Sequence, residues 1–282
     1  MFKKLMKYDM LSVWRLWWVL ATVVLSLSVV GAFVLRFVIT YIENPNFSFF
    51  TTIAILFLVL CFLVITSSIL ATELLIYLRF YKNFFTDEGY LTFTLPVSRR
   101  KLYLSKVLNA MIWEVLHVLL LLACAAIVLL IAPAKNGLFD TTAFVLIGQG
   151  ISGLWKTIGG WMIVYGVEIL LLSFSAQLFS IGLIHSCITI ASIIAKKAKL
   201  LVAIGIYYGI NMAFSLVTQI LGTISLMYLT DGFARLTLDF SLQDGFAFLA
   251  LLLLIVTAMM AVLAALLNCF ALDRIERRLN LA

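Results

Sequence analysis

Charged residues are scarce in this chain of 282 residues: Asp, Glu, Lys and Arg together make up only 12%. A soluble domain is about a quarter charged and about half apolar. Here 65% of the residues are hydrophobic, and the mean hydropathy is +1.17. This composition excludes a soluble enzyme, a disordered protein and a coiled coil. The chain needs lipid as its solvent, so we expect an all-α polytopic membrane protein.

Motifs for metal, nucleotide or hydrolytic chemistry are missing as well. The four cysteines lie far apart in apolar stretches and form no CxxC or Cys/His pair, so neither a zinc site nor a disulfide framework is indicated. The chain has no P-loop, no HExxH and no GxSxG. The GxGxxG spelling at 148–153 follows no strand, and we take it as accidental. We therefore expect no catalytic residue, cofactor or metal on this chain.

Six apolar stretches reach the roughly 20 residues that a membrane-spanning helix needs. They are 16–41, 51–78, 107–132, 161–194, 201–229 and 246–272. Sixteen Lys and Arg residues fall in the N-terminal segment, in 79–106, in 195–200 and in the C-terminal tail, against three in the other connections. This excess predicts that both termini are cytoplasmic, in a cell membrane of bacterial type. The net charge of +7 reflects this topology and indicates no nucleic-acid partner.

Two shorter segments have the pattern of amphipathic helices. In segment 1–15, Lys3, Lys4 and Lys7 lie off an apolar stripe, which predicts an interfacial helix on the inner membrane face, in contact with lipid. Segment 133–160 has a similar stripe and predicts an interfacial or re-entrant helix on the outer face. The two stripes are Phe2, Leu5, Met6, Met10, Val13 and Trp14, and Phe144, Ile147, Ile151, Leu154, Trp155 and Ile158.

Two of the predicted spans carry polar faces. The fifth has Tyr208, Asn211, Ser215, Thr218, Gly222 and Ser225 at steps of three and four residues, and the inner half of the second has Thr66, Ser67, Ser68 and Thr72. Residues at these steps share one face of a helix. Such faces either pack helices closely or line a wet passage, and both interpretations stay open. The sixth span is nearly all Leu and Ala before Asn268, and we expect it to face lipid.

Glu114 and His117, in the third span, spell one half of a di-iron Glu-x-x-His site. The second half is absent from the sequence. We favour a hydrogen-bonded polar pair between helices, with an intramembrane metalloenzyme as an alternative. Glu73, Glu168 and Arg36 lie nearer the span ends, where pairing or snorkelling explains them as well as transport chemistry does.

The connection 79–106 is the most distinctive stretch of the chain. An aromatic helical face, an acidic break at 87–89, a run of apolar anchors, Pro96 and a capping Ser98 follow one another. The aromatic and apolar residues are Tyr81, Phe84, Phe85, Leu91, Phe93 and Leu95. A plain linker lying on the headgroups seldom needs so many aromatic residues. We therefore predict a docking element for a cytoplasmic partner.

This stretch resembles the cytoplasmic coupling loop of ABC-2 type transporter permeases, the membrane subunits of type V ABC exporters. The family pattern is one or two acidic residues, Gly, an apolar pair, Leu-Pro, Ser, a basic residue and later a Lys. The matching positions are Asp87, Glu88, Gly89, Leu91, Leu95, Pro96, Ser98, Arg99 and Lys106. The six spans and inside termini agree with the family as well. Tyr90 and the outer segment between the third and fourth spans depart from its pattern.

The resemblance implies an exporter subunit whose cargo is a peptide, antimicrobial, drug or lipid-like molecule. Two permeases, alike or related, would pair in the membrane. Each would dock a separate ATPase, which binds ATP and Mg²⁺, through the matching positions from Asp87 to Arg99 together with Phe84 and Phe85. The second and fifth spans would line the passage with Thr66, Ser67, Thr72, Tyr208, Asn211, Ser215, Thr218 and Ser225. The alternative is a membrane scaffold or regulatory subunit whose polar faces only pack helices.

Overall fold

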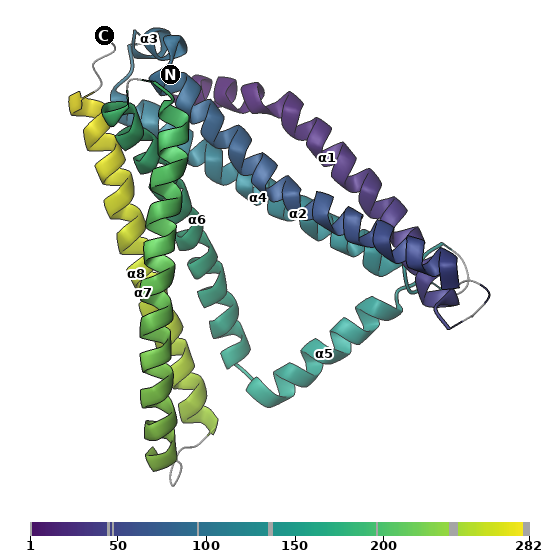
Figure 1. Cartoon of the computed structure of the whole chain (residues 1–282). Helices are drawn as coiled ribbons and strands as arrows, with labels where there is room; N and C mark the ends of the chain where they lie inside the picture. Colours follow the sequence, from purple (N-terminus) through teal and green to yellow (C-terminus); the bar gives the residue numbers. More distant parts are fainter. Residues whose placement is uncertain are drawn as a thin grey trace. The chain divides into compact units, whose positions relative to one another are not determined.

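The computed structural model describes residues 2–43, 46, 48–94, 96–134, 138–195, 197–236 and 242–278. All regular structure in these ranges is helical, and Figure 1 shows the eight helices. They are α1 (Phe2–Tyr41), α2 (Ser48–Phe85), α3 (Asp87–Phe93), α4 (Arg99–Ile131), α5 (Thr142–Ile158), α6 (Trp161–Ile194), α7 (Lys199–Leu236) and α8 (Leu242–Arg278).

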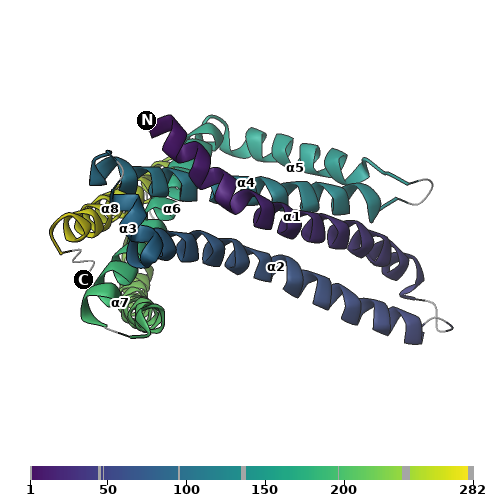
Figure 2. The same ribbon diagram turned by 90° about the horizontal axis from the view of Figure 1, so that it is seen from above.

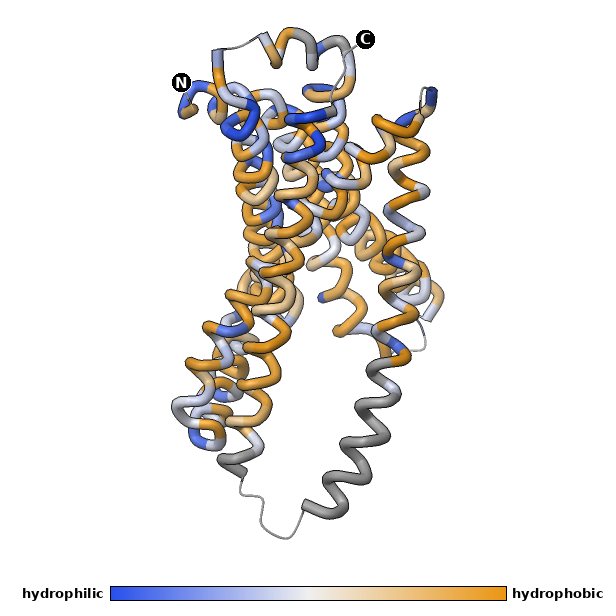
Figure 3. Tube along the Cα trace, turned by 90° about the vertical axis from the view of Figure 1, so that its left-hand side faces the viewer, coloured by the Kyte–Doolittle hydropathy of each residue, from blue (hydrophilic) through white to orange (hydrophobic). Residues whose placement is uncertain are grey.

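Six of these helices are long and apolar enough to cross a membrane, namely α1, α2, α4, α6, α7 and α8. Figure 3 shows hydrophobic residues along most of the length of the long helices. An α-helix pairs its backbone N–H and C=O groups internally, which hydrocarbon requires because it offers no other partner. The predicted class, a polytopic all-α membrane protein with six spans, is confirmed. The side that each terminus faces stays a prediction.

Several helices extend beyond the predicted spans. α4 begins at Arg99 rather than at residue 107. It starts directly after Ser98, whose backbone carbonyl accepts the N–H of Leu102 at 3.2 Å, so Ser98 holds the predicted capping position. α1 is one helix of 40 residues that continues through positions 15 and 16. Its length of about 60 Å is twice the thickness of a hydrocarbon core. The predicted interfacial helix and the first span are thus two parts of one helix.

The predicted helix within segment 133–160 is α5, which has 17 residues and no buried side chain. It ends at Ile158 and is capped by Gly159, which adopts a φ of 61° while its N–H donates to the carbonyl of Trp155 at 2.8 Å. This left-handed conformation favours glycine. The position of α5 at the outer membrane face stays a prediction.

The chain forms two compact units, which we describe separately. Unit 1 comprises Met1–Arg79 and Leu104–Gly159. In it, α1, α2 and α4 run side by side (Figures 1 and 2). The rings of Trp17 and Trp113 lie 5.2 Å apart, and Ser28 Oγ donates to the carbonyl of Cys124 at 3.1 Å. These contacts fix α1 against α4 through aromatic packing and one hydrogen bond.

A buried ion pair also joins α1 to α4. Asp9 accepts hydrogen bonds from Lys106 Nζ and, at 3.2 Å, from Ser105 Oγ. The side chains of Lys106 and Asp9 are only 7% and 10% exposed. Removing one partner of such a pair leaves an uncompensated buried charge. The pair therefore fixes the N-terminal part of α1 against the start of the third span.

Unit 2 comprises Phe80–Tyr103 and Gly160–Ala282, so it contains the end of α2, α3, the start of α4, and α6 to α8. α6 contacts both α7 and α8. Ser186 Oγ on α6 donates to the carbonyl of Leu267 at 3.0 Å, and Tyr165 Oη donates to the carbonyl of Phe246 at 2.8 Å. These bonds cross-link α6 to α8 at two levels.

We predict that Asp9→Leu and Lys106→Met each destabilise the protein by about 3–5 kcal/mol, because each removes the opposite charge from a buried ionic side chain. The double variant should recover most of the loss, since it buries two apolar side chains instead. The melting temperature of the purified protein in detergent checks this. Arg100→Met is a control, because it removes an ion pair in which Arg100 is 71% exposed. Equal losses in the single and double variants would contradict the pairing.

Candidate functional site

The predicted coupling loop contains a short helix of its own. α2 ends at Phe85, Thr86 forms a bend, and α3 occupies Asp87–Phe93 before α4 begins at Arg99. The prediction that residues 87–89 break the helix is therefore wrong in its position. The break falls at Thr86, and residues 87–89 open the next helix.

Gly89 allows α3 to fold closely against the end of α2. Its N–H donates to the carbonyl of Thr86 at 2.7 Å, and a Cβ at this position would lie 2.8 Å from the backbone oxygen of Phe84. Real Cβ atoms do not approach oxygen so closely, so a larger residue would push the two helices apart. The rings of Phe84 and Phe93 meet edge to face at 5.6 Å. An aromatic contact between the end of α2 and α3 thus supports the loop from its inner side.

The loop has a buried side and an exposed side. Phe84 and Phe85 are 0% and 8% exposed, so they support the loop from within rather than form its surface. The predicted docking residues that remain exposed are Glu88, Leu91, Pro96, Ser98 and Arg99. Leu91 is the most apolar of these and is 73% exposed. The side chain of Asp87 and the whole of Leu95 lie outside the described residues.

Arg99 attaches the loop to the end of α8. Its Nη1 donates to the backbone oxygens of Glu276 at 2.6 Å and Ile275 at 3.2 Å, and its guanidinium lies 5.4 Å from the ring centre of Phe93. Arg100 Nε pairs with the carboxylate of Glu276 at 3.0 Å. The last carbonyls of a helix lack intrahelical donors and attract cations. The loop and the C-terminal end of α8 are therefore joined.

Below the loop lies an aromatic–amide cluster, formed by Phe80, Tyr103, His185 and Asn268. The rings of Phe80 and His185 stack at 3.7 Å, and Tyr103 meets His185 edge-on at 5.6 Å. Tyr103 Oη donates to Asn268 Oδ1 at 2.8 Å, while Asn268 Nδ2 donates to the carbonyl of Leu178 at 3.2 Å. One cluster thus connects α2, α4, α6 and α8 within unit 2.

This cluster is not predicted by the sequence pattern, which indicates that α8 faces lipid. Much of α8 before residue 264 is exposed, but Ala264, Ala271 and Ile275 are buried. The signal was Asn268, an amide in a Leu- and Ala-rich helix. In hydrocarbon, an amide needs partners on a neighbouring helix.

The polar band of α2 divides into a packed half and an open half. Ser68 and Thr72 are buried, and their hydroxyls lie 3.3 and 3.1 Å from Nε2 and Nδ1 of His117 on α4. Thr72 therefore packs between α2 and α4 in this chain, and its place in a passage stays a prediction. Thr66 Oγ1 and Ser67 Oγ donate to backbone carbonyls of their own helix at 2.9 Å.

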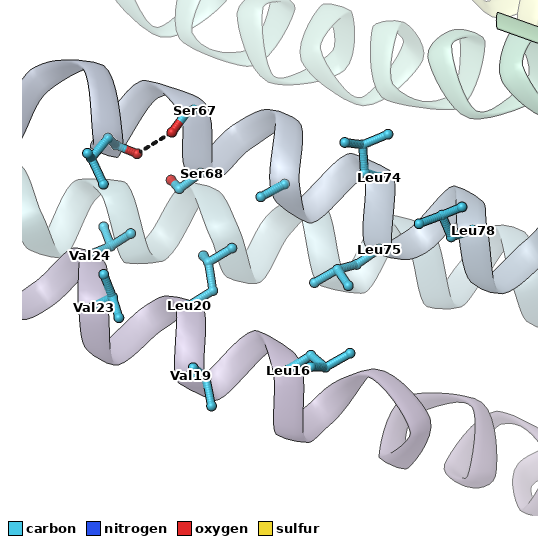
Figure 4. A pocket seen from close by; sticks show the side chains of 12 residues that line it. Leu16, Val19, Leu20, Val23, Val24, Ser67, Ser68, Leu74, Leu75 and Leu78 are labelled. Atoms are coloured by element: carbon cyan, nitrogen blue, oxygen red, sulfur yellow. Dashed lines mark hydrogen bonds between the residues drawn. The ribbon is translucent and has the colours of Figure 1, made fainter. Parts of the chain in front are cut away.

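Ser67 and Ser68 contribute to an apolar groove of about 490 Å³ between α1 and α2 (Figure 4). Figure 4 shows Leu16, Leu20 and Val23 from α1 opposite Leu75 and Leu78 from α2. The polar part of the lining is confined to the two serines. This chemistry suits acyl chains or apolar molecules rather than ions.

Both ring nitrogens of His117 lie within hydrogen-bond distance of hydroxyl groups on α2. This matches the favoured interpretation of a polar contact between helices, although the partners are Ser68 and Thr72 rather than Glu114. Among the described residues, no three His, Cys, Asp or Glu side chains come together as metal ligands would. The Glu114/His117 metal hypothesis therefore gains no third ligand there.

Within unit 2, the described part of the polar face of α7 is largely exposed. Ser215 and Thr218 are exposed and Tyr208 is 68% exposed, while Ala203 is the only buried residue in the part of α7 from 199 to 220. Asn211 Nδ2 donates to the carbonyl of Tyr207 at 2.9 Å. The side chain of Ser225 lies outside the described residues. The described packing within unit 2 therefore leaves Tyr208, Ser215 and Thr218 exposed.

Comparisons of the chain with protein-family models, curated proteins and solved structures give no match. The fold defines the class, a multi-pass α-helical membrane protein. Any narrower function rests on the coupling loop, the aromatic–amide cluster and the polar face of α7.

We predict that Gly182→Ala destabilises unit 2 by about 1–3 kcal/mol through overpacking. The added Cβ would lie 2.5 Å from Asn268 Nδ2 and 3.2 Å from Leu267 Cβ. Gly166→Ala, on the same helix, is the matched control, because nothing lies within 4 Å of its Cβ position. It should be neutral or slightly stabilising, since alanine favours helix. Melting temperatures in detergent compare the two, and equal effects would contradict the close α6–α8 contact.

Proposed function

We propose that this chain is the membrane-spanning permease subunit of an ATP-driven exporter of the ABC-2 type. It docks a separate ATPase subunit through the exposed side of α3 and the turn that follows it. The observation that carries the proposal is a short helix with one fixed side and one exposed side. Gly89, Phe84 and Arg99 hold its inner side in place. Glu88 and Leu91 stay exposed on its outer side. An exposed leucine next to a carboxylate, on a rigid support, is suited to binding another protein.

The way the loop is attached supports a role in transmitting force. A docking element can move a membrane helix only if the two are mechanically joined. Here α3 is joined to α8 by Arg99, and the aromatic–amide cluster below joins the ends of α2 and α4 to α6 and α8. Closure of the ATPases would therefore displace several helices of unit 2 together.

The polar face of α7 supports a passage shared with a second permease. Polar side chains are costly in lipid and normally face protein or water. Within unit 2, Ser215 and Thr218 are exposed and Asn211 is half-buried, and the described bonds of Asn211 and Thr218 run to carbonyls of α7 itself. A second permease, alike or related, would cover or share this face. Outward transport of a peptide, antimicrobial, drug or lipid-like cargo follows from the resemblance of the loop.

We predict that Leu91→Asp and Glu88→Arg abolish copurification of a soluble ATPase with the chain from its own host. Both side chains are exposed, so folding should be preserved. The interface with the ATPase would lose an apolar contact in the first variant and an attractive charge in the second. Mass spectrometry after gentle detergent extraction measures the stoichiometry. Lys197→Glu, which reverses an exposed charge in another predicted cytoplasmic connection, is the control and should retain the partner. Absence of any ATPase from the wild-type sample would refute the permease and favour a scaffold or regulatory subunit.

We further predict that Asn211→Leu and Thr218→Leu change ATP turnover by the complex in proteoliposomes about tenfold. Each variant removes one polar contact, and a contact of about 1.4 kcal/mol corresponds to a factor of ten. The abundance of the protein in the membrane should stay the same. Val217→Leu introduces the same residue off the polar face, at a position 52% exposed, and should leave turnover unchanged. Wild-type turnover in all three variants would leave the face with a packing role only.

A further inference from the structure

The N-terminal part of α1 has one side turned toward protein. Asp9, Val13 and Trp17 recur every four residues and are 7%, 5% and 6% exposed. Asp9 is bonded to Lys106, and Trp17 packs on Trp113. The apolar stripe of the predicted interfacial helix thus lies partly against α4.

The other side of the same helix is basic and aromatic. Its members lie at steps of three and four residues and therefore share a face. All of them are exposed; they are Lys3, Lys4, Lys7, Tyr8, Leu11, Trp14, Arg15 and Trp18. We call this set the basic face.

No carboxylate neutralises the basic face from its own helix. The only acidic residue in the first 42 positions is Asp9, which is bonded to Lys106 on the opposite, buried side. Four cationic side chains therefore point away from the protein in one direction. Their charge calls for an anionic partner.

Apolar groups accompany the charges. A shallow hollow of about 410 Å³ is lined by Lys3 and Lys7 together with Met6, Met10, Leu11 and Trp14. The helix continues into the first predicted span from residue 16, about two and a half turns after Lys7. Ammonium groups beside apolar and indole side chains, this close to the hydrocarbon boundary, match a phosphodiester headgroup with the start of its acyl chain.

We propose that the basic face is a binding site for anionic phospholipid headgroups in the leaflet that the N-terminus faces. The lysines contact the phosphodiester, and Leu11, Trp14 and Trp18 lie at the level where the acyl chains begin. This proposal is independent of the exporter function and rests on the membrane topology. Because the Asp9–Lys106 pair holds this part of α1 against α4, bound lipid stabilises the α1–α4 contact as well.

The test uses the full-length purified chain, titrated with phosphatidylglycerol or with phosphatidylcholine and read by native mass spectrometry. The variant Lys3→Gln/Lys4→Gln/Lys7→Gln removes three charges from the basic face. The matched control Lys101→Gln/Lys197→Gln/Lys199→Gln removes three charges from other connections predicted to lie on the same membrane side. The melting temperature without anionic lipid confirms that both variants fold.

The wild type should bind phosphatidylglycerol more tightly than phosphatidylcholine, and high salt should weaken this preference. Each lysine near an anionic lipid surface contributes a factor of about five in affinity. The variant on the basic face should therefore lose about 100-fold in affinity for phosphatidylglycerol, while the control keeps most of it. Equal binding of the two lipids, equal loss in both variants, or displacement of the lipid by inorganic phosphate alone would overturn the proposal.

Discussion

Hydrocarbon as solvent is the constraint on which this structure depends. It accepts no hydrogen bond, so every backbone group must be paired within a helix, and each polar side chain must find a partner nearby. Thr66, Ser67 and Thr218 meet this demand by donating to carbonyls of their own helices. Groups that cannot do so gather in clusters between helices, as in the contacts of Lys106 with Asp9 and of His117 with two hydroxyls of α2. These clusters identify the helix pairs that must stay together.

The same demand explains why the loop after α2 is more than a connection. Its aromatic underside, the tight approach at Gly89 and the bonds of Arg99 to the end of α8 give a small helix a fixed orientation. Such an element transmits displacement, whereas a flexible linker absorbs it. The polar face of α7 differs from the loop, because its described residues in unit 2 bond within their own helix and stay largely exposed. Unit 2 thus combines a firmly attached loop with an exposed polar face along α7, and these are the two features on which the proposed function depends.

Hydropathy predicts the long helices well because a helix in lipid is defined by its own residues. The predicted fourth span has the bounds of α6, Trp161–Ile194. The boundary between the predicted interfacial helix in segment 1–15 and the first span is not predictable in this way, because the helical pattern of residues continues unbroken through α1. The polar clusters between helices also could not be predicted from local sequence patterns, because their members are far apart in the chain. Tyr103 and Asn268 are 165 positions apart, and Asp9 and Lys106 are 97 apart. The docking role given to Phe84 and Phe85 came from their aromatic character, and only the fold reveals that they point inward.

The proposed permease requires that the exposed side of α3 contacts a nucleotide-binding subunit. Site-specific photo-crosslinking in the intact host membrane measures this contact, with a photoreactive amino acid in place of Leu91, which is 73% exposed. A second probe at Leu146, which is 61% exposed on α5, serves as the comparison. We expect the probe at position 91 to crosslink to a soluble ATPase and the probe at position 146 not to do so. The docking role would be contradicted if position 91 crosslinked only to lipid. It would also be contradicted if both positions crosslinked to the ATPase equally.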